Sequence, residues 1–335
     1  MRGTVGNRIL ERSIVKHISG EDGFRPGPGL DYSVLEKYTD DKGMERLRVA
    51  AQGHSSQGRI AIIRAGNNLA MAGARIREIM ITMTAGEDCP ERNIRKEMLS
   101  VTEYAAENDI RIIGGDTVFC GEGSSLNINV TAFSEVSEEI NIKLRRKPGA
   151  GDLVVVSGYT GLYGASLIFS KNEEDLGKRF PKSYIKKEAY NTGFTEKDLD
   201  VTYGAEAMIR GGAAFLHDVT FGGIYRTFYE LSLAANLGVL INHDSLPIRQ
   251  STIEVCDFYN INPYLLLGTG ALVAIVKKEE LKVFEEEMKK ASVDFAVAGT
   301  LTKEAKREIY SEKFDIRRSL NMYEEDEIFK LFKEI

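Results

Sequence analysis

The stretch Ile110-Arg111-Ile112-Ile113-Gly114-Gly115-Asp116-Thr117 decides the fold of the first half of the chain, because an apolar run stops there at two glycines, a carboxylate and a hydroxyl. The run predicts a buried strand, and the polar residues after it predict a turn. Glycines let backbone amides approach an anion closely, and an adjacent aspartate can hold the metal ion that accompanies a phosphate. Glycine and aspartate are also ordinary turn formers. The stretch alone therefore leaves open a phosphate site and a plain strand-to-turn junction.

The length and composition of the chain indicate two globular domains. Its 335 residues exceed one ordinary domain, and its 43% hydrophobic and 28% charged residues are typical of a globular protein. The segment Lys143–Asp152 is basic and rich in glycine, which favours a boundary there. We therefore predict domains over residues 1–143 and 144–335.

Charge and cysteine content exclude several classes of protein. The net charge is −6 and the basic residues are scattered among acidic ones, which argues against nucleic acid as a partner. Charges interrupt the first eighteen residues, and no window has the roughly 18 apolar residues that span a bilayer. Cys89, Cys120 and Cys256 lack metal-ligand spacing. We expect a cytoplasmic protein that acts without a membrane.

The hydrophobic pattern predicts helices and strands in both halves, and the fold class is α/β or α+β. In the first half we expect a helix in 1–20, a glycine-proline loop over 24–31, a hairpin of 32–38 and 46–51, a helix over 60–74, a strand over 79–84, a helix over 90–108, and a strand over 126–133 beside the opening one. In the second half we expect strands over 153–157, 239–242 and 271–276, helices over 161–170, 203–215, 224–237, 249–260 and 278–290, and an exposed irregular excursion over 171–197.

A second glycine-rich segment, His217-Asp218-Val219-Thr220-Phe221-Gly222-Gly223, directly precedes an amphipathic helical pattern. Thr220 or Asp218 is placed to cap that helix, and the amides that follow would point outward. The unpaired amides and the dipole of a helix start attract anions. A capped start with glycines for packing explains the pattern as well, and a lone His217 is more often structural than a base.

A third segment, Gly66–Ala74, has small residues at helical spacing and begins with Asn67 and Asn68. Small residues permit close helix packing, and asparagines are common helix caps. By itself, this segment favours a packed structural helix.

Together these segments resemble the aminoimidazole ribonucleotide (AIR) synthase superfamily. Gly66–Ala74 is similar to the family's Asn-Asp-Leu-Ala-Met-x-Gly-Ala helix, and Gly114–Thr117 to its Gly-Asp-Thr turn. Lys147–Asp152 resembles the Pro-Gly-Asp that opens the family's second domain. His217–Gly223 resembles the His-Asp-x-Thr-x-Gly-Gly turn, which is closest to the branch of HypE hydrogenase maturation proteins, and Gly268–Gly270 falls where that branch has a Glu-Gly turn. The similarity runs over roughly residues 27 to 300, and five pieces in order are more specific than any one.

The resemblance implies a two-domain fold, an N-terminal domain whose strands pair across a homodimer, and a C-terminal α/β sandwich domain. It also implies ATP and Mg²⁺ as cofactors, with a small molecule or a protein carrier as substrate. Carried over residue by residue, the nucleotide-binding set is Asn67, Asn68, Gly114, Gly115, Asp116, Thr117, His217, Asp218, Thr220, Gly222 and Gly223, and the metal ligands are Asp31 and Asp116.

The chain departs from the family pattern at three places. Asn68 stands where the family has a metal-binding aspartate, and Val49–His54 replaces the family's Thr-Thr-Asp, so two carboxylates are missing. HypE dehydrates a carbamoyl group on a cysteine of its own C-terminus, whereas here the last cysteine is Cys256. We therefore do not expect that reaction on this chain's own tail.

Three functions remain open. The first is an ATP-dependent enzyme that phosphorylates or activates an oxygen. An enzyme of hydrogenase maturation is one form of it, and a kinase similar to thiamine-monophosphate kinase is another. The second is a non-catalytic dimeric scaffold that binds a nucleotide or a partner protein. The third is a scaffold without a small ligand, because a fold alone does not define a function.

Overall fold

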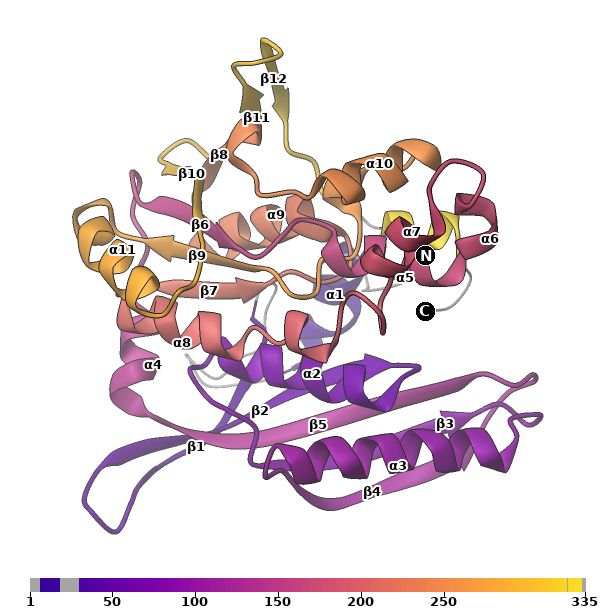
Figure 1. The fold of residues 1–335 in the computed structure, drawn as a ribbon. Helices are drawn as coiled ribbons and strands as arrows, with labels where there is room; N and C mark the ends of the chain where they lie inside the picture. Colours follow the sequence, from indigo (N-terminus) through magenta and orange to yellow (C-terminus); the bar gives the residue numbers. More distant parts are fainter. Residues whose placement is uncertain (1–6, 19–29, 324, 333–335) are drawn as a thin grey trace. The chain divides into compact units, whose positions relative to one another are not determined.

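The structure is a computed structural model that describes residues 7–18, 30–323 and 325–332 (Figure 1). The chain forms two compact units: Asp31–Ile142 is the N-terminal unit, and Lys143–Glu334 together with Met1–Leu30 is the C-terminal unit. The predicted helix in 1–20 is seen over its described part as α1 (Asn7–Ser13) and the 3-10 helix η1 (Val15–His17). Apart from Leu30 and Asp31, the predicted loop over 24–31 lies outside the described residues.

In its described part, the N-terminal unit contains a five-stranded sheet in the order β1-β2-β5-β3-β4. The predicted hairpin is confirmed, because β1 and β2 pair antiparallel from Ser33 opposite Ala50 to Thr39 opposite Glu45. The strand predicted at 126–133 was expected beside the opening stretch, and this is wrong: it pairs with β2 and β3, while β3 pairs with β4 in parallel. The strands are β1 (Ser33–Thr39), β2 (Glu45–Ser55), β3 (Glu78–Ala85), β4 (Arg111–Phe119) and β5 (Leu126–Ser137).

Two helices, both predicted from the sequence over 60–74 and 90–108, cover one face of this sheet. The helix α2 (Gly58–Ala70) packs on β2 and β5 and against α3 (Glu91–Glu107), which also contacts β4. Small residues let α2 approach the sheet, since a Cβ on Gly53 of β2 would collide with the backbone of α2. Alternate strand residues such as Val49, Ile81 and Val130 are buried beneath the helices. The opposite face of the sheet is not covered by the described residues of this unit, as Met80 and Leu35 are about half exposed at 43% and 51%.

The opening stretch forms a strand, but it is neither buried nor ended by the glycines. β4 continues through Gly114–Thr117 to Phe119, and most of its residues are exposed. It is an edge strand, which among the described residues pairs with β3 alone. The prediction of a buried strand followed by a turn at Gly114 is therefore wrong. An apolar run can lie on an exposed edge strand, and two glycines can lie within a strand without forming a turn.

The described part of the C-terminal unit contains a seven-stranded mixed sheet in the order β12-β11-β8-β10-β6-β9-β7. The predicted strands 153–157, 239–242 and 271–276 are confirmed as β6, β8 and β9, while β7, β10, β11 and β12 were not predicted. The strands are β6 (Leu153–Ser157), β7 (Phe215–Asp218), β8 (Gly238–Asn242), β9 (Leu272–Val276), β10 (Ala296–Thr302), β11 (Arg307–Ser311) and β12 (Ile316–Ser319).

Helices surround this sheet, and four of the predicted ones are confirmed within one to three residues. The helix predicted over 203–215 ends at Arg210, because Gly212 has a positive φ of 92° and the chain turns there into β7. The helices are α5 (Leu162–Lys171), α6 (Glu173–Leu176), α7 (Lys182–Glu188), α8 (Thr202–Arg210), α9 (Gly223–Ala235), α10 (Gln250–Phe258) and α11 (Leu281–Lys290). The helix α4 (Glu138–Leu144) spans the sequence boundary between the two units. The 3-10 helices are η2 (Glu196–Asp198), η3 (His243–Ser245), η4 (Pro263–Leu265), η5 (Lys278–Glu280) and η6 (Glu327–Lys330).

The segment 171–197 is not the irregular, exposed excursion predicted from its polarity. It contains α6 and α7, and Leu176 and Ile185 are buried at 0% and 1% exposure. Phe180 packs against Phe169 and stacks on Tyr184, with ring centroids 6.2 and 5.6 Å apart. A few apolar residues spaced through a charged segment are enough to fold it onto the core.

Among the described residues, none of the helices combines the length and the apolar character that crossing a bilayer requires.

Candidate functional site

The two asparagines predicted to bind nucleotide lie on α2 of the N-terminal unit. Asn67 is buried at 1% exposure, and Asn68 is half-buried. The side-chain amide of Asn68 donates to the carbonyl oxygen of Gln52 on β2 at 2.8 Å. This bond ties α2 to the sheet and leaves the side-chain oxygen of Asn68 as the atom that can face a ligand.

Gly114, Gly115, Asp116 and Thr117 lie on the exposed edge strand β4. The carboxylate of Asp116 accepts a hydrogen bond from the backbone amide of Thr117 at 2.8 Å and is otherwise open to solvent. In the sheet, Gly114 pairs with Met80, Met80 with Thr131, and Thr131 with Gln52. Three strand spacings of about 4.8 Å separate β4 from the part of β2 that binds Asn68, or about 14 Å. The N-terminal unit alone therefore does not bring Asp116 and Asn68 together.

Asp31, the other predicted metal ligand, is the first residue of the N-terminal unit and precedes β1. It is half-buried.

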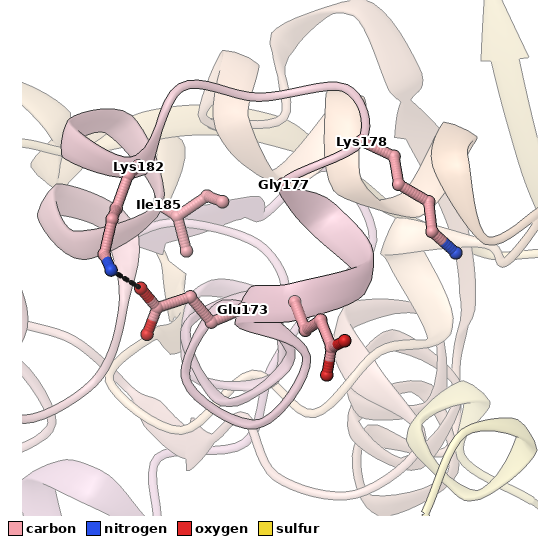
Figure 2. A pocket seen from close by; sticks show the side chains of 6 residues that line it. Glu173, Gly177, Lys178, Lys182 and Ile185 are labelled. Carbon is pink, nitrogen blue, oxygen red and sulfur yellow. Dashed lines mark ion pairs between the residues drawn. The ribbon is translucent and has the colours of Figure 1, made fainter.

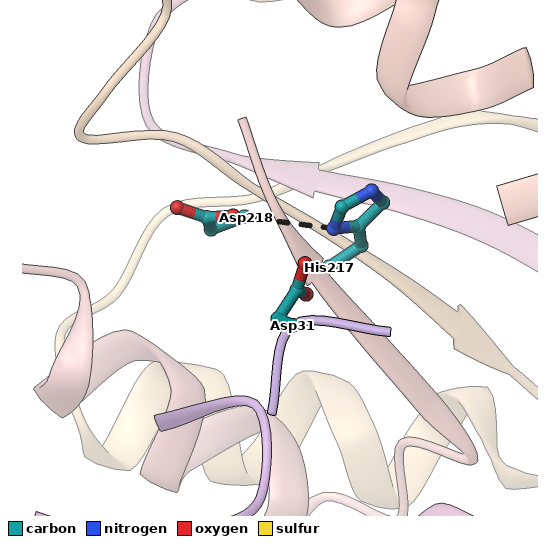
Figure 3. Close-up of side chains that lie close together, drawn as sticks. All are labelled: Asp31, His217 and Asp218. Carbon is teal, nitrogen blue, oxygen red and sulfur yellow. Dashed lines mark ion pairs between the residues drawn. The ribbon is translucent and has the colours of Figure 1, made fainter. Parts of the chain in front are cut away.

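In the C-terminal unit, His217 and Asp218 end the buried strand β7, and they do not begin the turn as the sequence suggested. Nδ1 of His217 lies 4.0 Å from a carboxylate oxygen of Asp218 (Figure 3), and Nε2 lies 3.3 Å from Oε2 of Glu230 on α9. The other carboxylate oxygen of Glu230 accepts from Nε of Arg226 at 2.9 Å. Burial opposes the charge on Glu230, but the hydrogen bond from His217 and the charge of Arg226 outweigh it and lower the pKa of Glu230.

This arrangement makes His217 part of a buried network of charges. His217, Asp218 and Arg226 are exposed by only 6%, 3% and 3%. Both ring nitrogens of the imidazole lie near carboxylates, which orients the ring. The structural interpretation of His217 is therefore favoured over that of a general base.

The turn after β7 is closed by its own backbone. The helix α9 begins at Gly223 with Gly222 as N-cap, and among the described residues no side chain caps it, so the expectation that Thr220 or Asp218 would do so is wrong. The amide of Gly223 donates to the carbonyl oxygen of Thr220 at 3.2 Å, and the amide of Gly222 donates to Asp326 at 2.6 Å. Both glycines adopt a positive φ, 84° and 63°, which favours glycine. Their amides do not point outward as predicted, and Thr220 is the half-exposed polar residue of the turn.

Two further glycine-rich loops meet this turn. The amide of Gly268 donates to the carbonyl oxygen of Thr220 at 3.3 Å, and the amide of Gly164 on α5 donates to that of Leu267 at 2.9 Å. The loop Gly158–Gly161 connects β6 to α5, and Gly268–Gly270 precedes β9, so the loops at one end of β6, β7 and β9 converge. Gly268–Gly270 was identified from the sequence, whereas Gly158–Gly161 was not. Its signal was present, because Ser157-Gly158-Tyr159-Thr160-Gly161 follows a predicted strand and opens a predicted helix.

Buried hydroxyls surround the start of α5. In the described part of the chain, the side-chain oxygens of Thr160, Thr252 and Thr269 are buried without a hydrogen-bond partner. All three threonines are close to Gly161. Thr160 directly precedes it, and the Thr252 methyl would lie 3.3 Å from a Cβ placed on Gly161. Thr269 follows Gly268, and a Cβ placed on Gly268 would lie 3.8 Å from the backbone nitrogen of Gly161. An unpaired buried hydroxyl costs about 1–3 kcal/mol, so three on residues near Gly161 call for a physical explanation.

A separate depression of about 660 Å³ lies between α6 and α7 (Figure 2). Lys182 reaches Glu173 across it at 3.7 Å, and the side chains of Lys178 and Lys182 are 74% and 77% exposed. Solvated ion pairs of this kind contribute little, and we assign no function to this depression.

The family of the chain follows from comparison with known proteins. The family model of the AIR synthase related protein N-terminal domain matches residues 42–136, and that of the C-terminal domain matches residues 149–312. The chain belongs to the AIR synthase superfamily. Within it, the chain is similar to hydrogenase expression/formation proteins and to carbamoyl dehydratases named HypE.

Two relatives illustrate this placement. A Methanocaldococcus jannaschii protein whose name places it among the hydrogenase expression/formation proteins is 25% identical over 294 residues, covering 83% of this chain and 81% of that protein. The carbamoyl dehydratase HypE of Rhodobacter capsulatus is 25% identical over 224 residues, covering 67% of this chain. The match spans 62% of that dehydratase, less than two thirds of its length.

Solved structures confirm the fold. A chain of the HypE-HypF complex superimposes with a TM-score of 0.71 at 20% identity, covering 93% of this chain and 99% of that chain. A structure of HypE in complex with ATP gives a TM-score of 0.68 at 18% identity, covering 96% and 95%. The two-domain fold expected from the sequence is therefore confirmed.

Proposed function

We propose that the protein is a HypE-like ATP-binding enzyme that uses ATP and Mg²⁺ to phosphorylate or activate an oxygen of a small molecule or a carrier group in hydrogenase maturation. Its relatives include carbamoyl dehydratases named HypE, and one structural neighbour is HypE in complex with ATP. The observation that carries the proposal is the convergence of three glycine-rich loops around the unpaired hydroxyls of Thr160, Thr252 and Thr269.

The chemistry of these loops fits a phosphate group. Hydroxyls donate to phosphate oxygens, and the start of α5 adds the amides and the dipole of a helix N-terminus. Gly161 has a positive φ of 65°, a backbone conformation that favours glycine. Without a side chain there, a phosphate can approach the backbone closely.

The residues also fit Mg²⁺ in their chemistry, since Mg²⁺ prefers oxygen ligands. Asp116 offers an exposed carboxylate, Asp31 a second one, and Asn68 a neutral oxygen. Asp31 precedes β1 and Asp116 lies on β4, the two opposite edge strands of the sheet, so the N-terminal unit alone does not bring these carboxylates together. In our proposal each remains a predicted metal ligand, and an ion held there would neutralise charge on the phosphates. Asn67, Gly114, Gly115 and Thr117 remain predicted contacts of the nucleotide.

Calorimetry tests this proposal. We expect the purified protein to bind ATP or ADP weakly in the presence of Mg²⁺, and Asp116→Ala to abolish the binding. Asp41→Ala is the matched control, because Asp41 is an exposed carboxylate of the same unit, in the β1–β2 turn. The absence of nucleotide heat from the parent protein would refute the enzyme proposal. If nucleotide binds, the release of ADP with candidate acceptors, thiamine monophosphate included, and analysis of the acceptor product identify the reaction.

We also propose that the protein forms a homodimer through the N-terminal unit. The edge strand β4 carries exposed apolar residues, with Ile113 exposed by 45% and Phe119 by 60%. On the uncovered face of the sheet, Ile113 and Leu35 line a hollow of about 390 Å³. Exposed edges and apolar faces of this kind are usually covered by another chain. Light scattering should give twice the chain mass of 37.3 kDa, and Ile113→Lys should shift it to one chain.

A second candidate function is a non-catalytic scaffold that binds a partner protein. Two observations favour it: the amides of Gly222 and Gly223 are already bonded within the chain, and the Asn68 amide holds β2. A structural neighbour is the HypE-HypF complex, so a HypF-like protein is the partner to test. Partner binding without nucleotide heat would favour the scaffold, and thiamine phosphorylation would favour a kinase like the neighbour bound to AMPPCP and TMP.

A further inference from the structure

A short segment after the matched family domains reaches into the converging loops. The C-terminal family model ends at residue 312, and Asp326 and η6 follow it. Asp326 is exposed by only 2%. One of its carboxylate oxygens accepts from the amide of Gly222 at 2.6 Å, and the other accepts from the amides of Leu267 and Ile328 at 3.2 and 2.8 Å. A single carboxylate therefore joins the turn before α9 to the loop before β9.

The neighbours of Asp326 hold this segment in place. The ring of Phe329 stacks on Phe221, with centroids 5.6 Å apart and an interplanar angle of 16°. Ile328 is fully buried, and the carboxylate of Glu327 accepts from the amide of Asn262 at 3.1 Å. These contacts hold the segment against the rest of the C-terminal unit, and none of them depends on the charge of Asp326.

A buried carboxylate at this position is costly, and its contacts show what it does. Burial raises the pKa of Asp326 to about 6, although hydrogen bonds from three amides oppose the shift. The group is thus largely ionised at neutral pH and spends its acceptor capacity on backbone amides. A buried polar group is tolerated when it satisfies partners that would otherwise be unpaired. Two of these partners belong to the loops that we propose to bind phosphate.

We propose that Asp326 is a positioning residue of the nucleotide site, which holds the Gly222 turn and the Leu267 loop in the arrangement that receives the phosphate. This inference rests on the proposed function. Asp326 does not touch the nucleotide in this proposal; it acts through the backbone of the two loops. The segment that follows the family domains is then part of the site.

The test compares two adjacent carboxylates. Asp326→Asn keeps the size of the side chain but places an amide group against an amide donor, so we expect ADP to bind about tenfold more weakly in calorimetry with Mg²⁺. Glu327→Gln is the matched control, because Glu327 is similarly buried at 9% exposure but accepts from the Asn262 amide and from Lys330, and not from the glycine loops. Its ADP affinity should stay within about twofold of the parent, as expected for a change that leaves the site alone.

Hydrogen exchange of peptides containing the Gly222 and Leu267 amides provides the second measurement. We expect slow exchange in the parent and in Glu327→Gln, and faster exchange in Asp326→Asn. Equal ADP affinity in Asp326→Asn and the parent, or an equal loss in both variants, would overturn the inference. Fast exchange of these amides in the parent would overturn it even if Asp326→Asn does not fold. If the parent binds no ADP, the proposed function and the nucleotide role of Asp326 both fail, while the exchange data still show whether Asp326 joins the loops.

Discussion

The two units use similar glycine-rich segments in opposite ways. In the N-terminal unit, Gly114 to Thr117 lie on an exposed edge strand, and Asp116 faces solvent. In the C-terminal unit, the turn from His217 to Gly223 is mostly buried and its glycine amides are bonded within the chain. Exposed carboxylates are available to a ligand or a second chain, whereas buried and bonded groups hold a loop in shape. The comparison teaches that one pattern of glycine, aspartate and threonine can provide either ligand groups or a rigid frame.

The largest effect should come from breaking the buried network of the C-terminal unit. Glu230→Ala removes the carboxylate that lies between His217 and Arg226, both of which stay buried. Removing one partner of a buried charge pair costs about 3–5 kcal/mol, and we expect a loss of that size in the free energy of unfolding by urea. Glu285→Ala on the exposed side of α11 is the control and should change it by less than about 0.5 kcal/mol. A small effect of Glu230→Ala would show that the network does not frame the turn.

A somewhat smaller effect should depend on pH through Asp326. Its pKa in the folded chain is about 6, above the ordinary value of 3.8, so its contribution to stability is full below about 4 and is lost as pH rises through 6. The difference of about two units corresponds to about 3 kcal/mol. Burial and the nearby charge of Glu327 raise the pKa, and the Cys256 thiol of α10 is the other titratable group that interacts with Asp326.

The measurement is the unfolding free energy of the parent minus that of Asp326→Asn, from about pH 4 to 7.5. Asparagine does not titrate, and the titratable groups that do not interact with position 326 cancel in the difference. We expect the difference to fall as pH rises, by up to about 3 kcal/mol. A difference that is constant, or that grows with pH, would contradict the raised pKa of this buried carboxylate.

Much of the fold could be predicted from the sequence because strong local patterns decide it. The hairpin of β1 and β2 and the long helix α3 have periodic patterns, the strands β6, β8 and β9 are short apolar runs, and all are confirmed. The errors fall where tertiary contacts decide. β4 is apolar but lies at a sheet edge, and the segment 171–197 is polar but folds over two buried side chains, Leu176 and Ile185.

The site was less predictable, for a similar physical reason. The glycine-rich segments could be found from composition, and the loop at Gly158–Gly161 carried the same signal. What the sequence cannot show is which amides are already bonded. The partner of the Gly222 amide is Asp326, more than a hundred residues away and in no motif. A long-range contact of this kind leaves no local pattern, so only the structure shows that the Gly222 amide is already hydrogen-bonded.

Two adjacent glycines of β4 give a sharper test within the N-terminal unit. A Cβ on Gly115 would collide with the carbonyl oxygen of Ile81 on β3, whereas a Cβ on Gly114 would lie 3.8 Å from the Met80 side chain. Gly115→Ala should therefore cost about 1–3 kcal/mol, and Gly114→Ala less than about 0.5 kcal/mol. Thermal unfolding of both variants provides the measurement. Equal effects would mean that Gly115 does not serve strand packing.

The smallest effect on stability should come from Asp116. Asp116→Asn changes an exposed side chain whose one described hydrogen bond is to the adjacent Thr117 amide, so the free energy of unfolding should change by less than about 0.5 kcal/mol. Nucleotide binding with Mg²⁺ should nevertheless be lost, because an amide is a poor substitute for a carboxylate at a metal ion. Urea unfolding and calorimetry on the same sample separate the two effects. A loss of both stability and binding would place Asp116, like Glu230, among the residues that frame the fold, and the contrast between the two units would no longer hold.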